Sequence, residues 1–328
     1  MEKGQLADNV PIIESSFRPA WWCRNPHLQT MWPLAVKPPH PRLKRERVEL
    51  DDGDFIDLDW TTNSTGPMVI VMHGLEGSAH SHYARRIMHA LPGRGMRGIL
   101  MHFRGRSGEP NRLARAYHSG ETGDINAIVE VLQKRESDAP LAVIGYSLGG
   151  NVLLKWLGEL GNEIPVQTAV AVSVPFVLSD LANHMNTGLA RWYQHYLVKS
   201  LHRTFAAKAA VVDLHLSVDE ISRLDSFWKF DDKVTAPIHG FDGAVDYYQQ
   251  CSSRQFIQGI RIPTLVLQAR DDPFMTQAVL PTEAELSESV QLELSDHGGH
   301  VGFISGGSPW SPRFWLEDRI LSFLEAAA

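Results

Sequence analysis

The sequence of 328 residues contains only two cysteines, Cys23 and Cys251, which excludes a disulfide framework and gives no recognised metal-binding spacing. This scarcity favours a reducing compartment, so we expect the protein to be cytoplasmic. Residues 1–8 lack the apolar core of a secretory signal, and no stretch approaches the roughly 18 apolar residues of a membrane-spanning helix. We therefore predict no integral membrane segment.

Positive charge is also scarce. The chain has 31 Lys and Arg against 38 Asp and Glu, which gives a formal net charge of −7. A nucleic-acid-binding surface needs an excess of basic residues, so we expect no binding to nucleic acid. The hydrophobic fraction of 43% and the charged fraction of 21% are instead typical of a globular protein with a sizeable buried core.

Strand-like and helix-like segments alternate along most of the chain. A hairpin is predicted around Asp51-Asp-Gly53, and the short apolar runs that follow it are typical of a parallel sheet buried on both faces. Residues before about 44 show no period and are predicted to form an irregular arm. The expected strands are residues 45–50, 54–60, 68–72, 98–103, 141–144, 169–174, 263–268 and 290–295, and the expected helices are 81–91, 122–135, 151–159 and 313–326.

Helix-like stretches without a convincing strand interrupt this alternation at residues 178–260. We predict that they form a helical cap, inserted over the carboxyl edge of the sheet, where open α/β sheets bind ligands. The predicted organisation is a core over residues 1–177 with its arm at about 1–44, a cap over 178–260, and the rest of the core over 261–328. We expect the aromatic side chains of the cap to pack in a core more than to line a pocket: Trp192, Tyr193, Tyr196 and Trp228.

A candidate nucleophile lies in residues 145–149, which read Gly-Tyr-Ser-Leu-Gly between a predicted strand and a predicted helix. A serine at such a turn needs strained backbone angles, and small residues two positions before and after it relieve the crowding. The helix that follows directs its free N–H groups and the positive end of its dipole toward the turn. Ser147 is therefore the predicted nucleophile, against the alternative of an ordinary turn that contains a serine.

A serine hydroxyl needs a base to take its proton and a third group to orient that base. Two carboxylates, Asp271 and Asp272, follow the predicted strand at 263–268. Two histidines, His297 and His300, follow the last predicted strand. The order serine, acid, histidine along the chain is that of the α/β-hydrolase arrangement.

Position in each loop favours one member of each pair. Asp272 is preferred over Asp271 because it directly precedes a turn-forming proline. His300 is preferred over His297 because the two glycines before it let the loop fold back over the serine. A metal site formed by these four side chains is the less favoured alternative, since it lacks a recognised ligand spacing and gives Ser147 no role.

A tetrahedral oxyanion needs two N–H groups aimed at it. Leu148, directly after the candidate nucleophile, is predicted to supply one of them. The loop His73-Gly-Leu-Glu-Gly77 follows the strand at 68–72, and the N–H of Leu75 is the second candidate. The glycines of this loop match no phosphate-binding pattern, so nucleotide binding is disfavoured. Because serine chemistry needs no further group, no metal or organic cofactor is predicted.

Other polar residues near the same edge are expected to be structural. His73 is interpreted as a hydrogen-bonding residue at a strand end. Arg104, His118 and Asp124 lie in or after the loops that follow the strand at 98–103, and we expect them to brace loops or cap a helix rather than to contact substrate.

Together the motifs resemble the AB hydrolase 4 family of the α/β-hydrolase superfamily. The resemblance implies an α/β-hydrolase fold with a mostly parallel sheet flanked by helices, and a serine carboxylesterase with Ser147, Asp272 and His300 as its triad. It rests on His73–Gly77, His102–Gly105, Tyr117–Gly120, Gly145–Gly149, Asp271–Phe274 and His297–Phe303, and on Asn25–Thr30 in the arm.

The predicted reaction is hydrolysis of a carboxylic ester, with a short to medium acyl chain, through an acyl-enzyme on Ser147. The expected partner is a small-molecule ester with an apolar acyl chain, and the sequence leaves the oligomeric state open. An acyltransferase that passes the acyl group to an alcohol is the first alternative. A non-catalytic α/β-hydrolase scaffold is the second.

Overall fold

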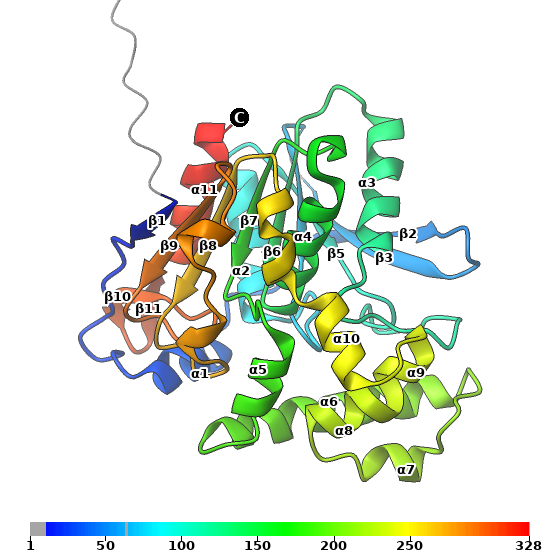
Figure 1. The fold of residues 1–328 in the computed structure, drawn as a ribbon. Coiled ribbons are helices and arrows are strands. Elements are labelled where there is room, and N and C mark those ends of the chain that lie inside the picture. Colours follow the sequence, from blue (N-terminus) through cyan, green and yellow to red (C-terminus); the bar gives the residue numbers. More distant parts are fainter. Residues whose placement is uncertain (1–10, 63–64, 328) are drawn as a thin grey trace, which may run out of the picture.

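The structure, a computed structural model, describes residues 11–62 and 65–327, so the predicted lack of a signal at 1–8 lies outside the described residues. Its centre is a nine-stranded sheet in the order β1-β9-β8-β7-β6-β4-β5-β3-β2 (Figure 1). β3 pairs antiparallel with β2 and β5, and the other neighbours are parallel. The strands are β1 (Ile12–Glu14), β2 (Leu43–Glu49), β3 (Phe55–Thr61), β4 (Met68–Met72), β5 (Arg97–Met101), β6 (Leu141–Tyr146), β7 (Thr168–Val172), β8 (Thr264–Ala269) and β9 (Val290–Ser295).

Helices cover both faces of this sheet (Figure 1). Because strand side chains alternate in direction, Val69 and Val71 of β4 pack with α2 (His82–Gly93) and α11 (Leu316–Ala327). Ile70 lies between them in the sequence and packs on the opposite face with α3 (Gly123–Arg135) and α4 (Leu148–Leu160). The predicted fold class, a mostly parallel sheet flanked by helices, is confirmed.

Between β7 and β8 the described chain forms helices and no strand. These helices lie together below the sheet in Figure 1 and enclose an apolar core of their own, which includes Tyr193, Phe205 and Phe230. None of the helices within residues 11–62 and 65–327 is long and apolar enough to cross a bilayer. The helices are α5 (Leu178–His184), α6 (Ala190–Ala209), α7 (Val218–Ser222), α8 (Phe227–Phe230), α9 (Ala236–His239) and α10 (Ala244–Cys251).

Two parts of the fold differ from the predictions. The arm is not irregular, because β1 pairs with β9 and Asn25 caps helix α1 (Pro26–Ala35) by accepting hydrogen bonds from two backbone N–H groups. β1 has three residues, too few for alternation to show, and Pro33 interrupts the helical pattern of α1. The hairpin of β10 (Ile304–Ser308) and β11 (Ser311–Phe314) was also not predicted, since its glycines carry no strand pattern.

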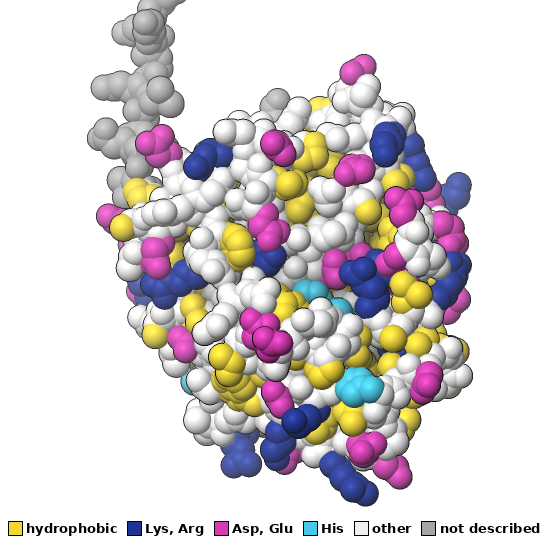
Figure 2. All heavy atoms as spheres, turned by 45° about the vertical axis from the view of Figure 1, so that its right-hand side comes forward, with side chains coloured by type: hydrophobic (Ala, Val, Ile, Leu, Met, Phe, Trp, Pro, Cys, Tyr) yellow, Lys and Arg dark blue, Asp and Glu magenta, His cyan; other side chains and the backbone are white. Residues whose placement is uncertain are grey.

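Acidic and basic side chains are interspersed on the face of the molecule shown in Figure 2, with small apolar areas between them. Many of the basic side chains are also paired. Arg45 and Arg47, from the basic stretch at residues 42–47, bind Asp59 and Asp57 of the neighbouring strand β3. These two arginines of the stretch are therefore ion-paired across the β2–β3 hairpin.

Candidate active site

Ser147 lies at the sharp turn between β6 and α4. Its backbone angles are φ 53° and ψ −116°, which are strained for any residue other than glycine. A Cβ atom at Gly145 would lie 2.5 Å from the carbonyl oxygen of Gly149, and one at Gly149 would lie 2.6 Å from that of His73. Both positions therefore require glycine, and the turn is held in the conformation that exposes the serine.

The imidazole of His300 lies between Ser147 and Asp272. Its Nε2 is 3.0 Å from the Oγ of Ser147, and its Nδ1 is 2.8 Å from Oδ2 of Asp272. The side chains of His300 and Asp272 are only 9% and 2% exposed. Phe274, which the sequence analysis did not single out, stacks on the imidazole with ring centroids 4.0 Å apart. The arrangement holds one ring nitrogen toward the hydroxyl and the other toward the carboxylate.

Helix α1 supports the loop that carries His300. The Oγ1 of Thr30 accepts a hydrogen bond of 2.9 Å from the N–H of His300. At Gly299, where φ is 58°, an added Cβ atom would lie 2.6 Å from the carbonyl oxygen of Pro26. The arm thus contributes to the site, and the Asn25–Thr30 motif was the sequence signal for it.

The second carboxylate and the second histidine form a separate pair. Nδ1 of His297 lies 3.3 Å from Oδ2 of Asp271, and the side chains are 47% and 18% exposed. Burial raises the pKa of Asp271 above its usual value, although hydrogen bonds from Gly299 and His297 oppose the shift. Within the described part of the chain, neither side chain contacts Ser147. The same part contains no cluster of His, Cys, Asp or Glu side chains arranged to hold a metal ion.

Leu75 and Leu148 line the same cavity as Ser147. Leu148 begins helix α4, so its N–H has no acceptor within the helix. The loop that contains Leu75 passes close to the serine, since a Cβ atom at Gly74 would lie 3.2 Å from the Cβ of Ser147. The residues predicted to stabilise an oxyanion therefore lie on two segments beside the hydroxyl.

Side chains hold the backbone on both sides of Leu75. The N–H of Gly74 donates to the Tyr83 hydroxyl at 2.8 Å, and the N–H of Glu76 donates to the Tyr117 hydroxyl at 2.9 Å. Among the described residues, the N–H of Leu75 itself has no hydrogen-bond partner. The Leu75 N–H is therefore an unpaired donor between two backbone N–H groups that are held by hydrogen bonds.

His73 is buried beneath this loop. Its Nδ1 lies 2.8 Å from the carbonyl oxygen of Gly74, and its Nε2 accepts a hydrogen bond of 3.2 Å from the N–H of Phe103. Burial, together with the nearby His102, keeps the pKa of His73 well below its ordinary value. A neutral imidazole with both nitrogens engaged fits the expected structural role.

A cavity of about 440 Å³ opens over Ser147, between the sheet edge and helices α1, α5 and α6. Trp192 and Tyr196 of α6 are 55% and 57% exposed, and their rings stack with centroids 6.3 Å apart. The prediction that these two side chains pack in a core is therefore wrong. The apolar and aromatic lining consists of Met31, Leu34, Leu75, Tyr83, Leu148, Pro175, Leu178, Leu181, Met185, Trp192, Tyr193, Tyr196, Leu197, Phe227, Phe274 and Val301.

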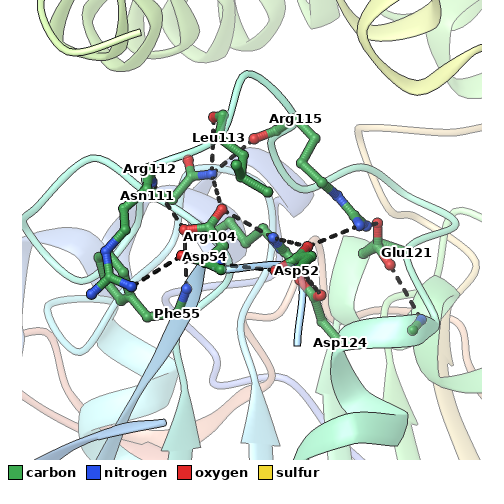
Figure 3. Close-up of polar contacts among 12 residues, drawn as sticks. Asp52, Asp54, Phe55, Arg104, Asn111, Arg112, Leu113, Arg115, Glu121 and Asp124 are labelled. Carbon is green, nitrogen blue, oxygen red and sulfur yellow. Dashed lines mark hydrogen bonds and ion pairs between the residues drawn. The ribbon is translucent and has the colours of Figure 1, made fainter. Parts of the chain in front are cut away.

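A second polar cluster is centred on Arg104 (Figure 3). Arg104 binds Asp124 at 2.7 Å, Asp54 at 3.0 Å and Asp52 at 2.8 Å. The side chains of Asp54 and Asp124 are 0% and 3% exposed. The cluster ties the β2–β3 turn to the start of α3, which is the bracing role expected for Arg104 and Asp124.

Known proteins resemble this chain in both sequence and fold. YheT of Escherichia coli strain K12, named as a candidate esterase, is 44% identical over 320 residues, which cover 94% of this chain and 93% of that protein. Phospholipase ABHD3 of Mus musculus is 28% identical over 335 residues, which cover 98% of this chain and 81% of that protein. A solved esterase structure from Pyrococcus furiosus shares the fold, with a TM-score of 0.57 at 18% identity over 89% of this chain and 97% of that one. Because residues 67–307 also match the alpha/beta hydrolase fold family, the chain belongs to that family.

Proposed function

We propose that the protein is a serine hydrolase that cleaves carboxylic esters, and that it belongs to the AB hydrolase 4 branch of its family. One observation carries the proposal: the imidazole of His300 lies 3.0 Å from the Ser147 hydroxyl and 2.8 Å from the Asp272 carboxylate, beside an apolar cavity. The esterase and phospholipase names of two relatives support the same class of reaction.

The geometry supports acyl transfer through a covalent intermediate. The Oγ of Ser147 attacks the ester carbonyl while Nε2 of His300 takes its proton, and Asp272 stabilises the imidazolium that forms. The N–H groups of Leu75 and Leu148 donate to the oxyanion, and the N-terminus of α4 adds its favourable dipole. His300 then protonates the leaving alcohol, and water repeats the sequence to release the acid. These steps need no metal or organic cofactor.

The lining of the cavity supports a substrate with an apolar acyl chain. A volume of about 440 Å³ lies in the usual range for small-molecule sites. We assign residues 178–260 the role of a cap, since α5 and α6 supply much of the apolar lining over Ser147. The two cysteines are free and buried, which suits a reducing compartment such as the cytoplasm.

The test is hydrolysis of p-nitrophenyl esters of graded acyl length by the unmodified protein and by Ser147→Ala. We expect kcat to fall by about 10⁴-fold or more in the variant, since removal of a triad nucleophile leaves only residual catalysis. Ser137→Ala, which changes an exposed serine, is the matched control. A fluorophosphonate probe should label the unmodified protein and not Ser147→Ala. Full activity in Ser147→Ala would refute the mechanism.

The same assay separates hydrolysis from acyl transfer to an alcohol. With an added short alcohol, we expect the free acid to remain the main product, because water is the acceptor in the proposed reaction. If most of the acyl group instead appears in a new ester, the protein is an acyltransferase that uses the same acyl-enzyme.

A further inference from the structure

Glu76 is a buried acidic residue with no role in the mechanism above. It directly follows Leu75 in the loop beside Ser147, and its side chain is only 3% exposed. Its φ of 57° lies in the left-handed region, which is uncommon for a residue with a side chain. Burial of a carboxylate is costly unless hydrogen bonds and an opposite charge compensate for it. The partners of Glu76 therefore indicate what this residue does.

The first partner of Glu76 is Tyr117, in the loop before α3. The Tyr117 hydroxyl accepts a hydrogen bond of 2.9 Å from the N–H of Glu76 and donates one of 2.8 Å to its Oε1. The ring of Tyr117 stacks on Phe103 at a centroid distance of 5.3 Å. This double contact fixes both the backbone and the side chain of the residue next to Leu75.

The other partners of Glu76 lie on helix α6, in the segment proposed to be the cap. Its Oε2 accepts hydrogen bonds from the hydroxyls of Ser200 at 2.8 Å and Thr204 at 2.6 Å, one helical turn apart. Ser200 and Thr204 lie on the same helix as Trp192 and Tyr196, which line the cavity. The carboxylate thus joins the loop beside Ser147 to a wall of the substrate cavity.

Arg106 completes the connection and neutralises the charge. Its Nη1 lies 3.0 Å from Oε2 of Glu76 and donates to Thr204 at 2.6 Å. Its Nη2 donates to the carbonyl oxygen of Glu76 at 2.7 Å, and its Nε donates to that of Gly77 at 3.3 Å. Arg106 therefore contacts the loop backbone, the carboxylate and the helix at the same time.

From these contacts we propose that Glu76 is a positioning residue, which fastens the loop of Leu75 to helix α6 and thereby aims the Leu75 N–H at the oxyanion. The inference rests on the proposed ester hydrolysis. These contacts couple the position of helix α6 to catalysis, because a shift of α6 moves Ser200 and Thr204 and therefore moves the loop that contains Leu75. Loss of the Glu76 contacts alone costs the Leu75 N–H its alignment with the transition state and leaves the apolar lining residues of the cavity unchanged.

The test uses Glu76→Gln and, separately, the double change Ser200→Ala with Thr204→Val. Glu76→Gln keeps the size of the side chain and removes its charge. The double change removes the two α6 hydroxyls that donate to Glu76, of which Thr204 also accepts from Arg106 and Ser200 also borders the cavity. We expect kcat to fall by about 100-fold in Glu76→Gln and by about 10-fold in the double variant, with KM within about 3-fold, because small misplacements of a catalytic group cost rate more than binding. The matched controls are Glu136→Gln, which breaks the distant Arg97 pair, and Lys199→Ala, an exposed change on α6.

A second measurement separates loss of alignment from general damage to the fold. An alkyl boronic acid forms a tetrahedral adduct on the serine, so its affinity reports on the oxyanion donors. We expect its affinity to fall in parallel with kcat in both variants and to stay unchanged in the controls, while circular dichroism shows folded protein.

Folded variants with unchanged kcat and boronate affinity, or with a loss confined to KM, would overturn the inference. If Glu76→Gln does not fold, the double variant decides, because it leaves the carboxylate, Arg106 and Tyr117 in place. The proposed function fails in a different way: the unmodified protein would then show no ester hydrolysis that depends on Ser147.

Discussion

Two histidine–aspartate pairs lie side by side in this protein and have different surroundings. His300 with Asp272 and His297 with Asp271 come from the same two loops, after β9 and β8. The inner pair is 2.8 Å apart, nearly buried, and reaches Ser147. The outer pair is 3.3 Å apart, and its histidine is 47% exposed. The same residue types therefore differ in access to the serine and in exposure to water.

The difference follows from how the loops are held. Oδ1 of Asp271 accepts a hydrogen bond of 2.9 Å from the N–H of Gly299, so the outer acid fixes the loop just before His300. Asp272 instead accepts from the N–H of Phe274 through one oxygen and binds His300 through the other. The outer acid supports the loop, and the inner acid orients the base. The predictions below test this division.

Among changes to the two histidine–aspartate pairs, the largest effect is expected from Asp272→Asn. The amide cannot stabilise the imidazolium of His300 and favours the wrong tautomer, so kcat should fall by about 10⁴-fold, as in other serine triads. The measurement is ester hydrolysis at saturating substrate, with circular dichroism to show that the variant is folded. A loss of less than about tenfold would mean that Asp272 does not orient the base.

A much smaller effect is expected from the matched change Asp271→Asn. Asparagine keeps an oxygen that accepts from Gly299, so the loop stays in place, and kcat/KM should fall by less than about tenfold. His297→Ala should have a similarly small effect, because that histidine is about half exposed and pairs with Asp271 instead of with Ser147. If Asp271→Asn cost as much as Asp272→Asn, the division between inner and outer pair would be wrong.

The comparison also shows how far the sequence could predict the site. Strand ends and turn residues predicted the two loops, because a buried parallel strand and a glycine pair leave clear patterns. They favoured Asp272 and His300 by position alone, and in the structure His300 contacts Ser147 while Asp272 contacts the other side of the His300 ring. Which neighbour faces the serine depends on contacts such as Thr30 with the His300 backbone, and those join segments far apart in the sequence.

Other features could not be predicted because they depend on tertiary packing. Trp192 and Tyr196 occur at helical spacing, and spacing alone does not say whether a side chain faces a core or a cavity. Glu76 was part of a recognised motif, yet its role depends on Ser200 and Thr204, more than a hundred positions later. A buried carboxylate has no local sequence signature.

Asp231 is an acid of a third kind, because within the described part of the chain it has hydrogen bonds but no ion pair with a histidine or another cation. Its carboxylate accepts from Tyr248 at 2.6 Å and from Thr235 at 2.7 Å, in the segment 178–260. Burial raises its pKa from 3.8 to about 6, although these two hydrogen bonds oppose the shift. The three acids thus differ in surroundings: one orients a base, one braces a loop, and one has its pKa raised to about 6 by burial.

The raised pKa of Asp231 predicts that the stability of the fold depends on pH. Of the variants described, Asp231→Asn should have the smallest effect on catalysis. Between about pH 4 and 6 the folded state holds a proton that the unfolded state has lost, so this group's contribution to stability falls as the pH rises. Asp231→Asn removes that penalty. We expect the variant to have a higher free energy of unfolding than the unmodified protein, and this advantage should be about 2 kcal/mol larger at pH 7.5 than at pH 4.5. Urea unfolding at the two pH values measures it, and kcat should be nearly unchanged.

The matched control for this change is Asp246→Asn, in the same helical segment. Asp246 is partly exposed, and hydrogen bonds from the Gln250 side chain and the Asp242 backbone lower its pKa. Its contribution to stability is lost only as the pH falls below its usual pKa of 3.8, so between pH 4.5 and 7.5 the control should change little. An Asp231→Asn effect that is equal at both pH values would mean that this carboxylate is ionised in the folded protein throughout the range, and that burial in this segment does not suppress its charge.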